Sequence, residues 1–208
     1  MSLIFRTGYL SAIFSFTAVA GYGIAQILQV FNLISYPWDE LFIYGFSLCI
    51  AIPFLITIIA LHQTLPSYKK MWSGIAAALA TAYVVFALMV YVVQLMVVLP
   101  ADAKDSRLDI LRMSPHSLFW TLDALAYLCM GIAVLFLVPA LKDIDTARWL
   151  RRLMIAHVVM TVVAMFVYFY PQFSTGLLVV ASPWLLTAGG VCAGLAIYFR
   201  KGNTLYIH

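Results

Sequence analysis

Charged residues are scarce in this sequence, and their scarcity excludes a water-soluble protein. Asp, Glu, Lys and Arg make up 10% of the 208 residues, whereas hydrophobic residues make up 65%. Soluble domains average about 25% charged and 45–50% apolar residues. The mean hydropathy of +1.02 points the same way. The chain is therefore expected to be an integral membrane protein in contact with the lipid bilayer.

Cysteines and catalytic motifs are also few or lacking. Cys49, Cys129 and Cys192 lie inside apolar blocks without a C-x-x-C spacing, so they predict neither a disulfide framework nor a zinc knuckle. The sequence contains no H-E-x-x-H, P-loop, G-x-S-x-G or dinucleotide fingerprint. These absences argue against a conventional enzyme, and we expect no bound cofactor.

Long apolar blocks separated by short polar segments predict an all-α membrane protein, a six-transmembrane-helix bundle. A helix needs about 20 apolar residues to cross the bilayer core, and a β-barrel strand would alternate instead. The first block continues past Ala18 to Leu33, so we expect a retained helix and no cleaved signal peptide. Residues 1–208 form a single domain with predicted spans at 8–33, 41–62, 72–99, 117–141, 151–170 and 177–199.

The distribution of Lys and Arg predicts the orientation of the bundle. With a cytoplasmic N-terminus, nine of the twelve basic residues fall on the cytoplasmic side. The other three, Lys104, Arg107 and Arg112, lie beside acidic residues in the outer loop 100–116. The positive-inside rule then places both termini in the cytoplasm. The net charge of +4 reports this topology and gives no case for nucleic-acid binding.

Small residues within the last span indicate close packing of helices, and aromatic residues near span ends indicate where the helices meet the membrane surface. Gly190 and Gly194 form a G-x-x-x-G in the last span, which favours close packing within the chain, with a homodimer as the alternative. Trp and Tyr side chains prefer the membrane interface. We therefore expect interface anchors at Trp38, Trp72, Trp149, Trp184, Tyr36, Tyr168 and Tyr170.

The predicted fourth span carries an acidic residue inside the hydrocarbon. His116, Trp120, Asp123 and Tyr127 are spaced i, i+4, i+7 and i+11, which places them on one helical face. A carboxylate inside the membrane costs several kcal/mol unless it is paired, hydrogen-bonded or hydrated. We therefore expect Asp123 to point into the bundle.

Other spans carry polar residues toward the same outer side. Helix direction brings these residues to a depth similar to that of Asp123, where they would surround an outward-facing polar cavity suited to a polar, cationic or lipidic molecule. The alternative is that they are interhelical hydrogen bonds, each contributing about 0.6–2 kcal/mol. The predicted cavity residues of these spans are Tyr22, Gln26, Gln29, Glu40, Tyr44, Ser47, Tyr91 and Gln94.

Three functions follow from these patterns. The favoured one is a small-molecule or lipid binding protein, in the form of a transporter or a sensor, with its site around Asp123. The second is a structural or accessory membrane protein without a ligand. The third is a metal- or haem-dependent membrane enzyme using His62 and His157, although these are more simply an interfacial histidine and a core histidine bonded to Thr161.

Several segments resemble a group of uncharacterised bacterial multi-pass membrane proteins. The resemblance implies a six-helix bundle in the bacterial cytoplasmic membrane and carries no activity over to this chain. It runs from the second span into the fifth and lies in Pro37-Trp38-Asp39, Phe46-Ser47-Leu48, Leu61-His62, Lys69-Lys70-Met71-Trp72-Ser73, Val90-Tyr91-Val92-Val93-Gln94-Leu95, Asp123-Ala124-Leu125-Ala126-Tyr127 and Arg148-Trp149-Leu150-Arg151.

Overall fold

The structure, a computed structural model, describes residues 2–101, 106–142 and 147–205. Within these ranges the chain is helical, without strands, and six helical segments are long and apolar enough to cross a membrane. The prediction of an all-helical chain with six helices long and apolar enough to span a membrane is confirmed. The long helices are α1 (Leu3–Val30), α2 (Trp38–Thr64), α3 (Lys70–Val93), α4 (Leu118–Ala140), α5 (Arg148–Phe169) and α7 (Pro183–Leu205), and the short helix α6 (Thr175–Ala181) precedes α7.

Two of the predicted spans differ from the helices in the structure. The first span begins earlier, at Leu3, and ends at Val30, shortly before Asn32 adopts a left-handed conformation with φ 54°. The last span is divided at Ser182 into α6 and α7. Pro183 is the first residue of α7, a position that proline tolerates because the first helical N–H groups have no partner within the helix. The acidic residues at 102 and 105 and Lys104 of the predicted outer loop lie outside the described residues.

The end of α3 changes its hydrogen-bonding pattern. Residues Gln94–Val98 form a π turn, in which the backbone N–H of Leu99 donates to the carbonyl of Gln94 at 2.8 Å. A π turn adds one residue to the helical repeat, so it alters the direction of the side chains that follow. Its position at the end of the bundle next to the loop 106–117 makes Gln94 available for contacts outside the helix.

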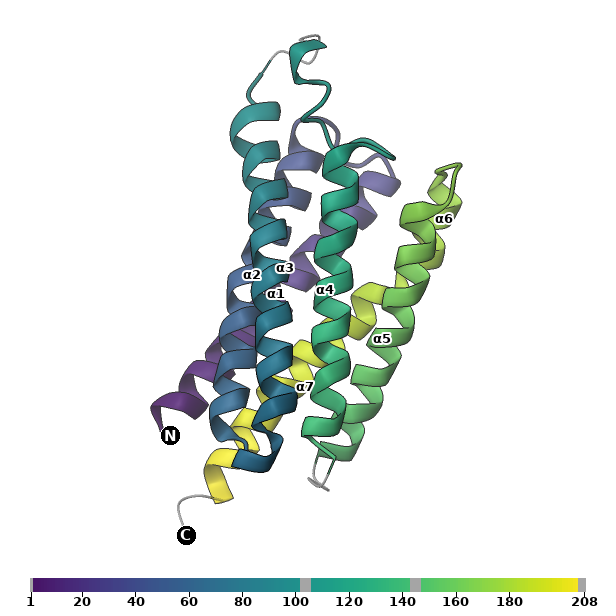
Figure 1. The fold of residues 1–208 in the computed structure, drawn as a ribbon. Coiled ribbons are helices and arrows are strands. Elements are labelled where there is room, and N and C mark those ends of the chain that lie inside the picture. Colours follow the sequence, from purple (N-terminus) through teal and green to yellow (C-terminus); the bar gives the residue numbers. More distant parts are fainter. Residues whose placement is uncertain (1, 102–105, 143–146, 206–208) are drawn as a thin grey trace.

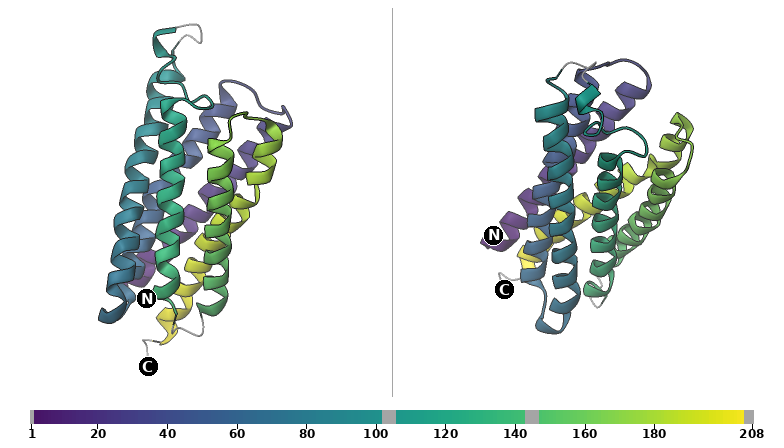
Figure 2. Two further views of the ribbon diagram at one scale, coloured as in Figure 1. Left: turned by 45° about the vertical axis from the view of Figure 1, so that its right-hand side comes forward. Right: turned by 45° about the horizontal axis from the view of Figure 1, so that its top comes forward.

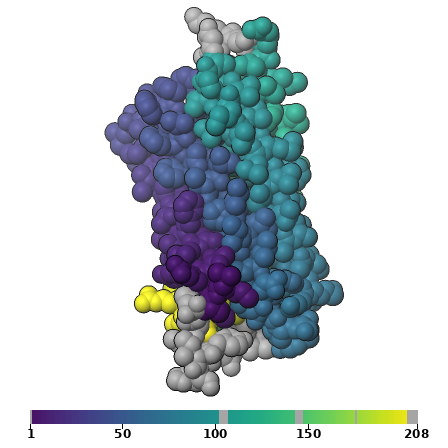
Figure 3. Space-filling model, turned by 90° about the vertical axis from the view of Figure 1, so that its left-hand side faces the viewer, coloured from purple at the N-terminus to yellow at the C-terminus, as the bar shows by residue number. Residues whose placement is uncertain are grey.

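The membrane-spanning helices pack in a closed ring. Each helix contacts its neighbours in the order α1, α2, α3, α4, α5 and α7, and α7 returns to α1. Figures 1 and 2 show α3, α4 and α5 running along the bundle, while α7 crosses obliquely behind α4 and α5. Figure 3 shows the face on which α1, α2 and α3 pack side by side. The start of α1 and the end of α7 lie at the same end of the bundle (Figure 1).

Glycines allow close approach between helices at two points around α5. A Cβ atom added at Gly131 of α4 would lie 2.3 Å from the side chain of Thr161. One added at Gly194 of α7 would lie 2.6 Å from the side chain of Leu150. The predicted G-x-x-x-G therefore faces a neighbouring helix of the same chain, and a homodimer stays a prediction.

Candidate functional site

A cavity of about 570 Å³ opens at the end of the bundle opposite the start of α1 and the end of α7. Its walls come from the last turns of α1 and α5, the first turns of α2, α4 and α7, the short helix α6 and Tyr91 of α3. The volume lies within the roughly 300–1,000 Å³ of typical small-molecule sites. The cavity is therefore large enough for an organic molecule.

Asp123 lies in the wall of this cavity and is only 3% exposed. Tyr91 on α3 donates its hydroxyl hydrogen to Oδ1 at 2.6 Å, and Tyr168 on α5 donates to Oδ2 at 2.5 Å. Each carboxylate oxygen therefore accepts one hydrogen bond from a different helix. Such bonds to an ionised acceptor are shorter and stronger than those between neutral groups. The expectation that Asp123 points into the bundle is confirmed.

A third tyrosine extends this network. The hydroxyl oxygens of Tyr91 and Tyr127 lie 3.3 Å apart. A phenol has a single hydrogen, and the hydrogen of Tyr91 is directed at Asp123, so Tyr127 is left to donate to Tyr91. A chain of hydroxyls thus leads from Tyr127 through Tyr91 to the carboxylate, and each bond polarises the next.

Aromatic rings surround the carboxylate. Trp120 and Tyr168 have ring centroids 4.8 Å apart, and the indole N–H of Trp120 donates to the backbone carbonyl of Tyr168 at 3.0 Å. Tyr127 and Trp184 meet edge to face at 4.8 Å. We call the Tyr and Trp residues of the lining the aromatic wall; they are Tyr22, Tyr44, Tyr91, Trp120, Tyr127, Tyr168 and Trp184.

Two fully buried side-chain atoms of the lining residues have no hydrogen-bond partner within the described part of the chain. They are the indole Nε1 of Trp184 and the hydroxyl of Ser47. Both side chains are buried, at 6% and 2% exposure. Buried polar groups are nearly always hydrogen-bonded, so these two groups are exceptions, and both atoms are closed off from solvent in this structure.

The charges in the lining are all acidic. Among the described residues, the cavity is lined by Asp123 and Glu40 and by no Lys, Arg or His. The nearby Arg112 forms an ion pair with Asp109 at 3.3 Å, and neither residue belongs to the lining. The electrostatic field of such a lining attracts cations and repels anions.

The structure brings together ten of the residues that the sequence assigned to the polar cavity. Those on α1 and α2 approach α4 because the six helices form a closed ring. Their role in binding stays a prediction. The ten residues are Tyr22, Gln26, Gln29, Glu40, Tyr44, Ser47, Tyr91, Trp120, Asp123 and Tyr127.

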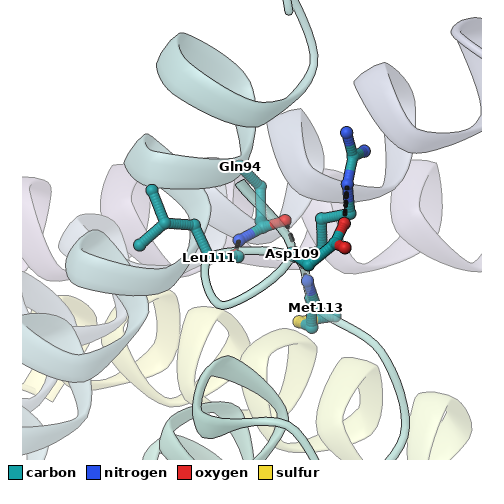
Figure 4. Close-up of polar contacts among 5 residues, drawn as sticks. Gln94, Asp109, Leu111 and Met113 are labelled. Atoms are coloured by element: carbon teal, nitrogen blue, oxygen red, sulfur yellow. Dashed lines mark hydrogen bonds and ion pairs between the residues drawn. The ribbon is translucent and has the colours of Figure 1, made fainter. Parts of the chain in front are cut away.

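Gln94 is buried but does not line the cavity. Its Nε2 donates to the carbonyl of Leu111 at 2.7 Å, and its Oε1 accepts from the backbone N–H of Met113 at 3.1 Å. Figure 4 shows the amide group directed at these two backbone groups. Because Met113 and Pro115 line the cavity, Gln94 fixes the loop segment that borders it.

His116 also lies outside the cavity lining. The helix α4 begins at Leu118, and Ser117 caps it by accepting from the backbone N–H of Trp120 at 3.2 Å. His116 therefore precedes the helix; it is exposed and has a left-handed conformation with φ 66°. The prediction that His116 lies on the same helical face as Asp123 is wrong, because the helix begins only after the Ser117 N-cap and does not include residue 116.

Two important members of the aromatic wall were predicted to be interface anchors. Tyr168 bonds to Asp123, and Trp184 is buried against Tyr22, Tyr127 and His157. Their positions near the ends of predicted spans suggested the membrane interface, but in the structure both side chains line the cavity inside the bundle. Pro183 is the feature of the sequence that could have indicated the buried position of Trp184, because it begins a new helix and places Trp184 in the first turn.

The two histidines of the metal or haem hypothesis have different partners. His62 Nδ1 lies 2.8 Å from the hydroxyl of Ser73, so it links α2 to α3. His157 Nδ1 lies 3.2 Å from the hydroxyl of Thr187 on α7. His157 is a buried core histidine, as predicted, and its bond to Thr161 is made by its backbone carbonyl, which accepts from the Thr161 hydroxyl at 3.0 Å.

No cluster of three or more His, Cys, Asp or Glu side chains suited to a metal ion occurs among the residues that the structure describes. Comparison with protein-family models, curated proteins and solved structures gives no match. The functional assignment therefore depends on the geometry and chemistry of the cavity.

Proposed function

We propose that this protein binds a small organic cation in the cavity around Asp123. The observation that carries this proposal is a buried carboxylate, held by Tyr91 and Tyr168, in a lining without basic residues among those described. An ammonium group beside Asp123 would provide the positive partner that a carboxylate at this depth otherwise lacks. Binding is the shared first step of the transport or sensing roles that the sequence suggested.

The aromatic wall supports a cation as the ligand. The faces of Trp and Tyr rings carry negative potential, and they attract ammonium groups within about 6 Å of the ring centre. Desolvation strengthens this attraction to about 2 kcal/mol or more. Tyr127, Trp184 and Trp120 present such rings from α4 and α7 beside the carboxylate.

The hollow interior favours binding over the scaffold hypothesis. A purely structural role for Asp123 and the polar residues would be served by dry, filled contacts between helices. Here the same residues border about 570 Å³, and two buried atoms of the lining residues, the Ser47 hydroxyl and the Trp184 indole nitrogen, have no hydrogen-bond partner among the described residues. These features are typical of a ligand site, in which a few polar groups orient a molecule within an apolar surface.

Calorimetric titration of the purified protein in lipid nanodiscs tests this function. The probe is tetramethylammonium, with sodium chloride at equal ionic strength as the reference. We expect saturable binding to the wild type and at least a tenfold loss of affinity in Asp123→Asn, which keeps the shape of the side chain and removes its charge. Asp109→Asn, which removes an exposed carboxylate outside the lining, should bind as the wild type does.

The thermal unfolding midpoint of each variant establishes that it is folded. Equal binding by the wild type and a folded Asp123→Asn variant would overturn the proposal. Stronger binding of an anion of similar size, such as pivalate, would overturn it as well, because an acidic lining should repel that probe.

Both termini are assigned to the cytoplasm of a bacterial cell as part of this proposal. The basis is the excess of Lys and Arg at one side of the bundle, nine of twelve residues. The cavity, at the opposite end from the start of α1, then opens on the outer side of the cytoplasmic membrane.

Cysteine labelling in intact cells tests this orientation. Ser114 and Ser67 are exposed and lie at opposite ends of the bundle, in the loop before α4 and in the turn before α3. In a variant without Cys49, Cys129 and Cys192, Ser114→Cys should react with a membrane-impermeant maleimide in intact cells. Ser67→Cys should react only after lysis, and the reverse pattern would contradict the assignment.

A further inference from the structure

The rim of the cavity between α1 and α6 is apolar and exposed. Ile27, Val30 and Phe31 at the end of α1 line the cavity on one side, and Leu178 and Val179 of α6 line it on another. Ile27 is 55% exposed and Val179 is 60% exposed, although both line the cavity. A residue that is at once lining and exposed lies where the cavity meets its surroundings. We call the gap bordered by Ile27 and Val179 the portal.

The packing of α6 explains why a gap is left on this side. The helix α6 packs mainly on α5 and α7, whereas α1 packs on α2 and α7. The break at Ser182 directs α6 away from the axis of α7, so the upper part of the last span does not continue along α1 (Figure 1). The two rims of the portal therefore belong to helices that each pack mainly on other helices, with α7 as their shared neighbour.

The location of the portal relative to the membrane is set by its side chains. Both rims belong to segments apolar enough to lie within the bilayer, Leu3–Val30 and Gly176–Gly202. Exposed Ile and Val side chains of such segments are expected to contact acyl chains. The cavity thus has a polar, aromatic inner end at Asp123 and an apolar side opening toward lipid.

We infer that the ligand is an amphiphile, with a cationic head group at Asp123 and the aromatic wall and an alkyl chain that leaves through the portal into the outer leaflet. This inference rests on the proposed function and names its ligand class. A cavity of about 570 Å³ exceeds what a small ammonium group fills, and the remaining lining is largely apolar. Such a ligand would enter sideways from the membrane, because its chain never has to cross water.

A series of alkyltrimethylammonium ions with chains of increasing length tests the inference in nanodiscs. Burial of one methylene group contributes about 0.8 kcal/mol, which corresponds to roughly a fourfold change in affinity. We expect affinity in the wild type to increase about two- to fourfold per added carbon over the first few carbons, because part of each methylene stays in contact with lipid. Asp123→Asn in identical nanodiscs gives the background from partition into the bilayer.

Two matched pairs of variants locate the portal. Val179→Trp and Ile27→Trp fill it from opposite sides, whereas Val180→Trp and Ile24→Trp change neighbours that are 55% and 60% exposed and outside the lining. The two portal variants should lose at least tenfold in affinity for octyltrimethylammonium, a member of this series, and keep their affinity for tetramethylammonium. The control variants should bind both compounds as the wild type does.

The outcomes separate this inference from the proposed function. Binding of tetramethylammonium without a gain from longer chains would overturn the inference and leave the cation site intact. A loss of both compounds in folded portal variants, or equal losses in the control variants, would also overturn the portal. Absence of binding above the Asp123→Asn background for every chain length would overturn both.

Discussion

The hydroxyl of Tyr168 donates a 2.5 Å hydrogen bond to Oδ2 of Asp123 and so joins the end of α5 to α4 at the wall of the cavity. The ring of Tyr168 also packs on Trp120, whose indole N–H donates to the Tyr168 backbone carbonyl. One residue therefore fixes the carboxylate and the adjacent aromatic ring at the same time. The position of α5 relative to α4 is thereby coupled to the geometry of the cavity wall around Asp123.

Replacement of Tyr168 by Phe removes this hydroxyl and keeps the ring. We expect the free energy of unfolding to fall by about 1 kcal/mol, the range for a hydrogen bond within a helical membrane protein. Unfolding by sodium dodecyl sulfate in mixed micelles measures the change. Tyr170→Phe is the matched control, since this ring is 41% exposed at the end of α5, and its variant should stay within about 0.5 kcal/mol of the wild type.

Replacement of Gln94 by Leu removes both bonds to the loop backbone. The backbone N–H of Met113 loses its acceptor, so we expect its amide hydrogen to exchange at least tenfold faster, a change of about 1.4 kcal/mol in local opening. Hydrogen exchange followed by mass spectrometry measures this rate. Gln63→Leu, at an exposed position near the end of α2, should leave it unchanged, and an unaltered rate in the Gln94 variant would contradict the anchoring role.

Replacement of Gly131 by Ala tests the contact between α4 and α5. The added methyl group would overlap Thr161, so we expect a loss of about 1–3 kcal/mol in the free energy of unfolding. Gly45 is the matched control in α2, because a Cβ atom there meets nothing within 4 Å. Its change to Ala should be neutral or stabilise by up to about 1 kcal/mol through helix propensity. Equal effects at the two positions would contradict the close approach of α4 and α5.

Replacement of Ser47 by Ala removes a buried hydroxyl that has no partner within the described residues. We expect the ligand-free protein to gain about 1 kcal/mol, because the cost of burying that unpaired group disappears. Ser11→Ala should have the opposite effect, since the Ser11 hydroxyl accepts from Thr57 at 3.0 Å and donates to the carbonyl of Thr7 at 2.7 Å. Detergent unfolding compares the two, and a loss at Ser47 would indicate a partner in solution.

The fold could be predicted from the sequence because each span satisfies its backbone hydrogen bonds internally. Apolar length alone then indicates a helix, and the block around Tyr83, for example, has no other stable arrangement inside a bilayer. The ends of helices depend on weaker, local signals. Ser117 caps α4 within one residue of the predicted start at 117, whereas Pro183 begins a new helix inside the predicted span 177–199 and so divides it.

The candidate site could be predicted in part, for a related reason. An acidic residue in hydrocarbon must face inward, and helical spacing then identifies Trp120 and Tyr127 on its own helix. The partners of a side chain from other helices depend on rotation and tilt, which spacing does not encode. Tyr168 and Trp184 were therefore assigned to the interface, and the backbone partners of Gln94 were missed altogether.

The contact between α1 and α7 makes the first and last membrane segments of the chain neighbours. Synthesis proceeds from the N-terminus, so α1 through α5 are made before α7, the helix that closes the ring. Before α7 inserts, Trp184 is absent from its position beside Tyr127, and the cavity lacks the part of its wall that α7 provides. A nascent chain that stops before its final segment would therefore lack Trp184 and the α7 side of the proposed cation site.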